Sequence, residues 1–95
     1  MTTFVIGDFE WDARKAAVNL AKHGVSFEEA LTALADPRAI EAPDLVHPAR
    51  FITIARSELM RVLFVVHVES LPSGRLRIIS ARRATRAQRR KYEED

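Results

Sequence analysis

The order of the sequence patterns predicts a single α+β domain, spanning residues 1–95, in which helices pack on an antiparallel sheet. A strand pattern and two helical patterns come first, three or four strand patterns follow between residues 39 and 81, and a last helical pattern begins at about residue 85. The connections over residues 57–61 and 69–74 have hairpin length, so the strands that they join should be antiparallel. We expect a sheet of four to five strands.

The N-terminal region predicts a strand followed by a helix. Residues 4–11 resemble one short strand, kinked around Gly7. Asp12 can cap the helix, which should reach about His23, because Gly24 easily adopts the left-handed conformation that ends a helix. Four apolar residues at helical spacing should form its buried face, namely Ala13, Ala16, Ala17 and Leu20. Another face should carry Lys15, Asn19 and Lys22.

A second helix should follow at once and form a helical hairpin with the first. Ser26 and Glu29 have the spacing of a capping box, and Pro37 ends the pattern after about Ala35. The buried stripe should consist of Phe27, Ala30, Leu31 and Leu34.

Strand patterns dominate the C-terminal half. Residues 39–42 predict an edge strand, and residues 50–56, 62–68 and 75–81 predict three more. The run VLFVVHV at 62–68 is apolar on both faces, so it should be central. A capping box at Thr85 and Gln88 predicts a last helix to about Glu94.

The sequence lacks the motifs typical of several kinds of catalytic and metal-binding site. The chain has no cysteine, which excludes disulfides and thiolate ligands. It has no Gly-rich phosphate loop, no HExxH and no serine elbow, and its three histidines are spaced without a metal-binding pattern. We therefore expect no metal and no cofactor. The absence of a signal peptide or a run of ~20 apolar residues predicts a cytoplasmic protein without membrane contact.

Charge is distributed unevenly along the chain. Residues 1–50 carry 5 basic and 8 acidic side chains, whereas residues 51–95 carry 10 basic and 5 acidic ones. Arginine outnumbers lysine 12 to 3, and guanidinium is the group that grips phosphate in a bidentate fork. The C-terminal half therefore favours a polyanionic partner, with a merely solvated basic face as the alternative.

Four side chains are candidates for catalysis, and each has a structural alternative. Strand alternation places Arg82 with Ile78 and Ser80, at a strand end where it could hold a phosphate rather than form an ion pair. His67 could transfer a proton or be a core histidine bound to a backbone carbonyl. Lys22 could bind phosphate or move a proton, or simply complement the helix dipole. Tyr92 is a further proton-transfer candidate.

The last helix opposes its own dipole. Arg86 falls in its first turn and acidic residues fall in its last turn, an order that costs about 0.3–1 kcal/mol per charge. This helix is either a solvated terminal helix or one whose Arg86 and neighbours point at a phosphate or an acidic partner.

Several blocks together resemble the BrnT toxins over nearly the whole chain. They are Phe9–Asp12, the run NLAKHGVSFEEA at 19–30, Asp36-Pro37, the run ISARRAT at 79–85, and RRKYE at 89–93. The resemblance implies a RelE-like α+β fold and a metal-independent ribonuclease, the toxin of a type II toxin–antitoxin pair neutralised by a DNA-binding BrnA antitoxin. It implies site positions at Lys22, Arg82 and the arginines around the sheet. Family members often have glycines near positions 55 and 60, where this chain has Ala55 and Met60.

The resulting functional prediction is RNA cleavage that inhibits translation and growth. The ribose 2′-OH would attack the adjacent phosphate, held by Arg82 with support from Arg56, Arg61, Arg83 and Arg86. Proton transfer would fall to Lys22, His67 or Tyr92. DNA contact is expected only through the antitoxin. The alternatives are a non-catalytic RNA- or partner-binding module and a purely structural partner domain.

Overall fold

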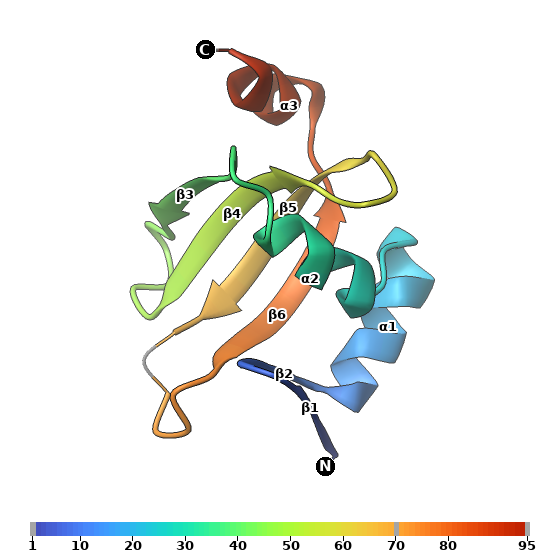
Figure 1. Ribbon diagram of the computed structural model, residues 1–95, viewed down its shortest axis with the longest axis vertical. Helices are drawn as coiled ribbons and strands as arrows, with labels where there is room; N and C mark the ends of the chain where they lie inside the picture. The colour runs from blue at the N-terminus through green and yellow to red at the C-terminus, as the bar shows by residue number, and fades with distance from the viewer. Residues whose placement is uncertain (1, 70, 95) are drawn as a thin grey trace.

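The computed structural model describes residues 2–69 and 71–94 and shows a six-stranded sheet with three helices over that range. The strand order is β1-β2-β6-β5-β4-β3. In Figure 1, α1 and α2 lie over one face of the sheet and α3 lies at one end. The strands are β1 (Thr3–Ile6), β2 (Phe9–Asp12), β3 (Ile40–Pro43), β4 (Arg50–Arg56), β5 (Val62–Val68) and β6 (Leu76–Arg83). The helices are α1 (Ala13–His23), α2 (Phe27–Leu34) and α3 (Arg86–Glu93).

The N-terminal strand pattern forms two strands, so the predicted count of four to five strands was wrong. Gly7 has a φ of 57°, a left-handed conformation that turns the chain back, and β1 pairs antiparallel with β2. The sheet is also mixed, because β2 pairs with β6 in parallel over two residue pairs. Connection lengths cannot reveal this contact, since Phe9 and its partner Leu76 are 67 positions apart and several other elements lie between them.

The central strands form as predicted. Strands β4 and β5 have the predicted bounds, and β5 pairs antiparallel with both β4 and β6. The edge strand β3 pairs antiparallel with β4. None of the helices within the described ranges is long and apolar enough to cross a bilayer.

An irregularity in β6 changes which side chains share a face. The pairing passes from Val66↔Ser80 to His67↔Ile78, which leaves Ile79 as an extra residue in β6. Both Ile78 and Ala81 are consequently buried, although they are three positions apart. The predicted alternation, which placed Arg82 on the face of Ile78, was therefore wrong.

Helix α1 is capped as predicted but turns a different face inward. The Asp12 carboxylate accepts from the Arg14 and Lys15 N–H groups at 2.8 and 3.1 Å, and Gly24 has a φ of 68°. The buried residue of α1 is Asn19, whereas Leu20 is 50% exposed. Of the predicted apolar face, Ala16 packs partly buried against the core, whereas Ala13, Ala17 and Leu20 are exposed. The prediction was wrong for these three because a polar contact decides how this helix packs.

Asn19 closes the open edge of β6. Its amide nitrogen donates to the Ala81 carbonyl at 2.7 Å and to the Val25 carbonyl at 2.9 Å, and its Oδ1 accepts from the Ala81 N–H at 3.1 Å. Strand β2 pairs with β6 only at Leu76 and Arg77, so the edge beyond them needs other partners. The asparagine side chain supplies both a donor and an acceptor.

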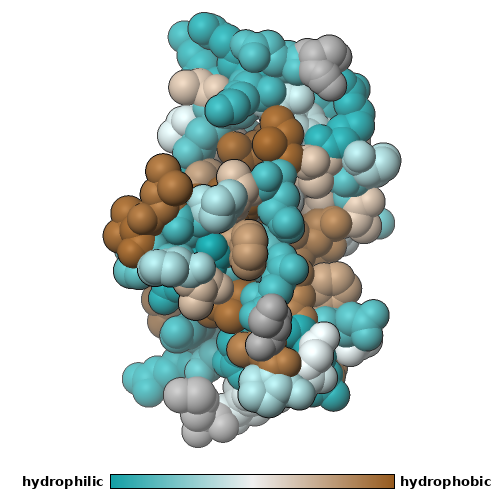
Figure 2. Space-filling model, turned by 90° about the vertical axis from the view of Figure 1, so that its left-hand side faces the viewer, coloured by the Kyte–Doolittle hydropathy of each residue, from teal (hydrophilic) through white to brown (hydrophobic). Residues whose placement is uncertain are grey.

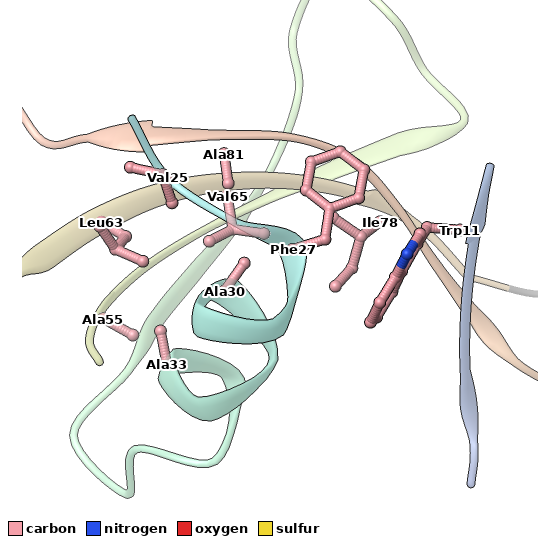
Figure 3. Close-up of a cluster of buried hydrophobic side chains, with 10 residues drawn as sticks. All are labelled: Trp11, Val25, Phe27, Ala30, Ala33, Ala55, Leu63, Val65, Ile78 and Ala81. Atoms are coloured by element: carbon pink, nitrogen blue, oxygen red, sulfur yellow. The ribbon is translucent and has the colours of Figure 1, made fainter. Parts of the chain in front are cut away.

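The buried side chains of helix α2 pack against the sheet and form part of the hydrophobic core. Phe27, Ala30 and Ala33 are fully buried, and the Phe27 ring meets the Trp11 ring edge-on at 5.9 Å between centroids. Figure 3 shows these side chains gathered between α2 and the strands. Leu31 and Leu34, which were predicted to be buried, are only partly so. Helices α1 and α2 each pack more on the sheet than on one another, so the predicted hairpin is held mainly by the sheet.

Candidate functional site

Helix α3 is fixed at one end of the sheet by its first and last turns. The capping box forms as predicted: the Gln88 N–H donates to Thr85 Oγ1 at 3.2 Å, and the Thr85 N–H donates to Gln88 Oε1 at 2.9 Å. Tyr92 is the buried residue of the helix, and its hydroxyl donates to Asp36 Oδ2 at 2.5 Å. The Arg56 guanidinium lies 5.8 Å from the centre of the Tyr92 ring.

A basic pocket, the arginine pocket, lies where α3 meets the strand ends. Its cavity of ≈ 280 Å³ is lined by Arg56 at the end of β4, Arg61 after the β4–β5 turn, Arg83 at the end of β6 and Arg89 in α3, together with Glu93. Figure 2 shows that the end of the molecule carrying α3 is largely hydrophilic. Four guanidinium groups around one hollow are a geometry that suits a phosphate.

Arg61 is held in place by Glu29, which lies buried in the first turn of α2. Its Nε donates to Glu29 Oε2 at 2.9 Å, a second nitrogen donates to Glu29 Oε1, and Nη2 donates to the Gly24 carbonyl at 3.0 Å. The Ser57 hydroxyl donates to the same carboxylate at 2.7 Å. The hydrogen bonds from Arg61 and Ser57 lower the pKa of Glu29. Ser26 does cap α2, but Glu29 does not complete the predicted capping box, because it binds Arg61 instead.

The other arginines of the pocket have no carboxylate partner among the described residues, although Arg56 lies against the Tyr92 ring. Within residues 2–69 and 71–94, the guanidinium groups of Arg56, Arg83 and Arg89 form no ion pair. Arg83 shares a face with the buried Leu63, with which it pairs across the strands. These three cations remain available to an anion from outside.

Arg82 lies outside the arginine pocket, on the other face of the sheet. It pairs with Phe64, and its guanidinium carbon lies 4.0 Å from the centre of the Phe64 ring. One nitrogen donates to Gln88 Oε1 at 3.2 Å and to the Arg83 carbonyl at 3.1 Å. Arg82 thus holds the first turn of α3 in place through its hydrogen bond to Gln88.

His67 lies in the core, far from the arginine pocket. Its side chain is fully buried and hydrogen-bonds through Nε2 to Thr53 Oγ1 at 2.7 Å. Burial lowers its pKa. Val62 lines the pocket, and the five positions from Val62 to His67 correspond to about 17 Å along the strand.

The remaining predicted residues are also separate from the pocket. Lys22 is exposed and lines a different cavity, of ≈ 500 Å³, between α1 and β6. Burial and Asp36 raise the pKa of Tyr92, whose hydroxyl is committed to that carboxylate. Arg86 is exposed at the start of α3 and does not line the pocket.

The structure therefore brings together three of the predicted residues, Arg56, Arg61 and Arg83, and adds two that were not assigned to the site. The additions are Arg89 and Glu93, which lie four positions apart on one side of α3. Their spacing, together with the inverted charge order of the helix, is the signal that could have found them.

Comparison with known proteins identifies the family. A family model described as "Ribonuclease toxin, BrnT, of type II toxin-antitoxin system" matches residues 11–88. The chain belongs to the BrnT family. The 1.1 Å crystal structure of the Brucella abortus ribonuclease toxin BrnT matches this BrnT-family chain with a TM-score of 0.64 and 27% identity, over 80% of this chain and 94% of that one. Among curated protein sequences, none matches the chain.

Membership of the BrnT family confirms the resemblance carried by the sequence blocks. The matched range contains Arg56, Arg61 and Arg83, and it ends one residue before Arg89. The arginine pocket thus combines residues of the matched BrnT range with the last turns of α3.

Proposed function

We propose that this BrnT-family protein is a metal-independent endoribonuclease that cleaves RNA in the arginine pocket. The observation that carries the proposal is the convergence of Arg56, Arg83 and Arg89, without ion-pair partners within the described residues, beside the Glu93 carboxylate. Membership of a ribonuclease toxin family supports RNA as the polyanion.

The proposed reaction is attack of a ribose 2′-OH on the adjacent phosphate. The bond from the 2′ oxygen to phosphorus forms as the bond from phosphorus to the 5′ oxygen breaks, leaving a 2′,3′-cyclic phosphate and a 5′-OH. Guanidinium groups stabilise the charge that builds up on the phosphate oxygens, and each such contact is worth about 10²–10³-fold in rate. We assign this role to Arg83, Arg89 and Arg56.

The proton of the 2′-OH needs an acceptor. Glu93 is the carboxylate that lines the pocket, so we assign it this role. The departing 5′ oxygen takes a proton from water. Lys22, His67 and Tyr92 have no part in the proposed step, since none of them lines this pocket.

Arg61 acts as a positioning residue. Its hydrogen bonds to Glu29 and to the Gly24 carbonyl fix the turn between β4 and β5 against both helices. The ends of β4 and β5 flank this turn, so the contact also holds Arg56 at the pocket. Arg82 has a similar role toward α3 through Gln88.

The proposed partner is a BrnA-type antitoxin that covers the basic end of the protein and brings it to DNA. Residues 51–95 carry 10 basic against 5 acidic side chains, so an acidic or amphipathic antitoxin segment should associate faster at low salt. Covering the arginine pocket would exclude RNA and so neutralise the toxin.

Inducible expression in a bacterial host tests this function. Expression of the unaltered chain should arrest growth and deplete cellular RNA, and co-expression of the cognate antitoxin should restore growth. Arg83→Ala should be harmless at equal protein level, and Arg38→Ala, an exposed change outside the pocket, should remain toxic. Growth arrest without RNA cleavage would instead support a binding module.

A further inference from the structure

A second cluster of ionisable side chains lies away from the arginine pocket. It consists of Glu41 in β3, His67 in β5 and Glu69, which directly follows β5. One ligand atom from each residue lies within 4.8 Å of the others. His67 and Glu69 are two positions apart at the end of β5, and the pairing of β3, β4 and β5 brings Glu41 to them.

His67 points a nitrogen without a hydrogen bond at this cluster. The side chain is 0% exposed, and Nδ1 has no hydrogen-bond partner within the described residues. Glu69 Oε2 lies 3.3 Å from that nitrogen, and Glu41 Oε2 lies 3.8 Å from Nε2. A buried nitrogen facing a carboxylate without a hydrogen bond is costly unless something joins the two.

The other ring nitrogen of His67 is held by Thr53. Nε2 and Thr53 Oγ1 are 2.7 Å apart. When Nε2 donates its proton to the hydroxyl, Nδ1 carries a lone pair and faces the negative oxygen of Glu69. A cation between them would turn this repulsion into two coordinate bonds. Metal-bound histidines commonly have their second nitrogen hydrogen-bonded in this manner.

We propose that Glu41, His67 and Glu69 form a binding site for a divalent transition metal ion such as Zn²⁺. Zinc bonds of about 2.0–2.1 Å in a tetrahedral arrangement place neighbouring ligand atoms about 3.4 Å apart, close to the 3.3 Å between His67 Nδ1 and Glu69 Oε2. Three protein ligands leave the fourth position to water.

The exposure of the carboxylates gives the ion a way in. The side chains of Glu41 and Glu69 are 54% and 38% exposed, whereas His67 is buried beneath them. The two carboxylates also lie close enough for Glu41 to raise the pKa of Glu69, after burial the next cause of that shift. A cation would relieve this repulsion and would tie the edge strand β3 to β5 across β4.

This metal site is separate from the proposed ribonuclease centre. The experiment that tests it therefore measures metal binding directly and does not depend on RNA cleavage. Purified full-length protein, treated with a chelator and dialysed, is titrated with ZnCl₂ against a competing chromogenic chelator. We expect one Zn²⁺ per chain and, at saturation, a melting temperature raised by about 5 °C or more. Co²⁺ in place of Zn²⁺ should show the visible absorption of a protein-bound ion.

Variants decide where the ion binds. Glu69→Gln keeps the size of an exposed side chain and should lower the Zn²⁺ affinity at least about tenfold, as should Glu41→Gln. His67→Gln serves as a further variant if it folds by circular dichroism. His47→Gln, a histidine in the exposed loop before β4, should leave the affinity unchanged. Absence of saturable binding, or equal binding by wild type and Glu69→Gln, would overturn the proposal.

Discussion

Arg82 and Arg83 are neighbours in β6, yet they face opposite sides of the sheet and contact different partners. Arg83 pairs with the buried Leu63 and lines the arginine pocket, whereas Arg82 stacks on Phe64 and holds Gln88. The extra residue Ile79 decides this arrangement, because it shifts the alternation of the strand by one position before the two arginines are reached.

Alanine substitutions of Arg82 and Arg83 should therefore reduce RNA cleavage to different extents. We expect Arg83→Ala to lower kcat/KM for RNA cleavage by about 10²–10³-fold, because it removes a cation from the proposed phosphate site. Arg82→Ala should cause a smaller loss, through looser placement of α3. Cleavage rates of both variants, with circular dichroism to confirm folding, check this order. If Arg82→Ala proves the more damaging change, the phosphate is held on the Phe64 face instead.

Glu29 should make stability depend on pH in the acid range. Its pKa is lowered in the folded protein by Arg61 and Ser57, relative to the ordinary value of 4.5. The stabilisation is therefore present above that ordinary value and is lost as the pH falls through the lower, folded-state pKa. Urea unfolding of wild type and Glu29→Gln between about pH 3 and 7 should show the two proteins converging at low pH.

At neutral pH, Glu29→Gln should cost about 2–3 kcal/mol, since it removes charge-assisted hydrogen bonds from Arg61. Glu28→Gln, an exposed neighbour in the same helical turn, is the matched control and should change stability little. A pH-independent difference between wild type and Glu29→Gln would show that the ion pair contributes nothing through ionisation.

Met60 should be replaceable by glycine with a gain in stability. Its φ of 64° lies in the left-handed region, which costs a residue with a Cβ about 1–2 kcal/mol. Part of that gain is offset by the larger chain entropy of glycine when unfolded, so we expect a net increase of about 0.5–1 kcal/mol for Met60→Gly. Thermal or urea unfolding measures it.

Leu59→Gly is the control for that change. Leu59 is exposed like Met60, but its φ is not positive, so glycine there should be neutral or destabilising. The left-handed conformation at position 60 explains why proteins that this chain resembles would often have glycine near this position. A loss of stability in Met60→Gly would contradict the left-handed conformation at this position.

Asn19→Ala should destabilise the protein by about 2–4 kcal/mol. The change leaves the N–H and C=O of Ala81 and the Val25 carbonyl without their side-chain partners. Leu20→Ala, on the exposed side of the same helix, should stay within about 0.5 kcal/mol of wild type. The free energies of unfolding from urea titrations compare the two, and equal losses would mean that α1 is held by its apolar side chains.

Local rules explain what the sequence could predict of the fold. Asp12, Gly24 and the Thr85–Gln88 box act within a few residues, and the bounds of β4 and β5 follow from hydrophobic runs between turns. The errors concern contacts between distant segments. Nothing near Asn19 in the sequence reveals that it serves the open edge of β6, and nothing near β2 reveals its parallel partner.

The candidate site, like the fold, has features that the sequence could predict and features that depend on contacts between strands. An excess of arginine in the second half indicated a polyanionic partner, and the family resemblance pointed from there to the arginines around the sheet, among them Arg56, Arg61 and Arg83. The separation of Arg82 from Arg83 depends on one bulge, which alternation by twos does not anticipate. Glu69 lies only two positions after His67, but the approach of Glu41 depends on the pairing of β3, β4 and β5, which sequence spacing does not reveal.

The adjacent arginines of α3 allow the most direct test of the arginine pocket. Arg89 lines it, whereas Arg90 is exposed on the same helix and does not, so alanine at either position removes the same charge from the same segment. The measurement is the cleavage rate of a labelled RNA by purified wild type, Arg89→Ala and Arg90→Ala in excess EDTA, with product ends identified. We predict metal-independent cleavage to 2′,3′-cyclic phosphate and 5′-OH ends, a loss of about 10²-fold for Arg89→Ala and nearly full activity for Arg90→Ala. Equal rates for the two variants, or no cleavage by wild type until Mg²⁺ is restored, would contradict the proposed site and mechanism.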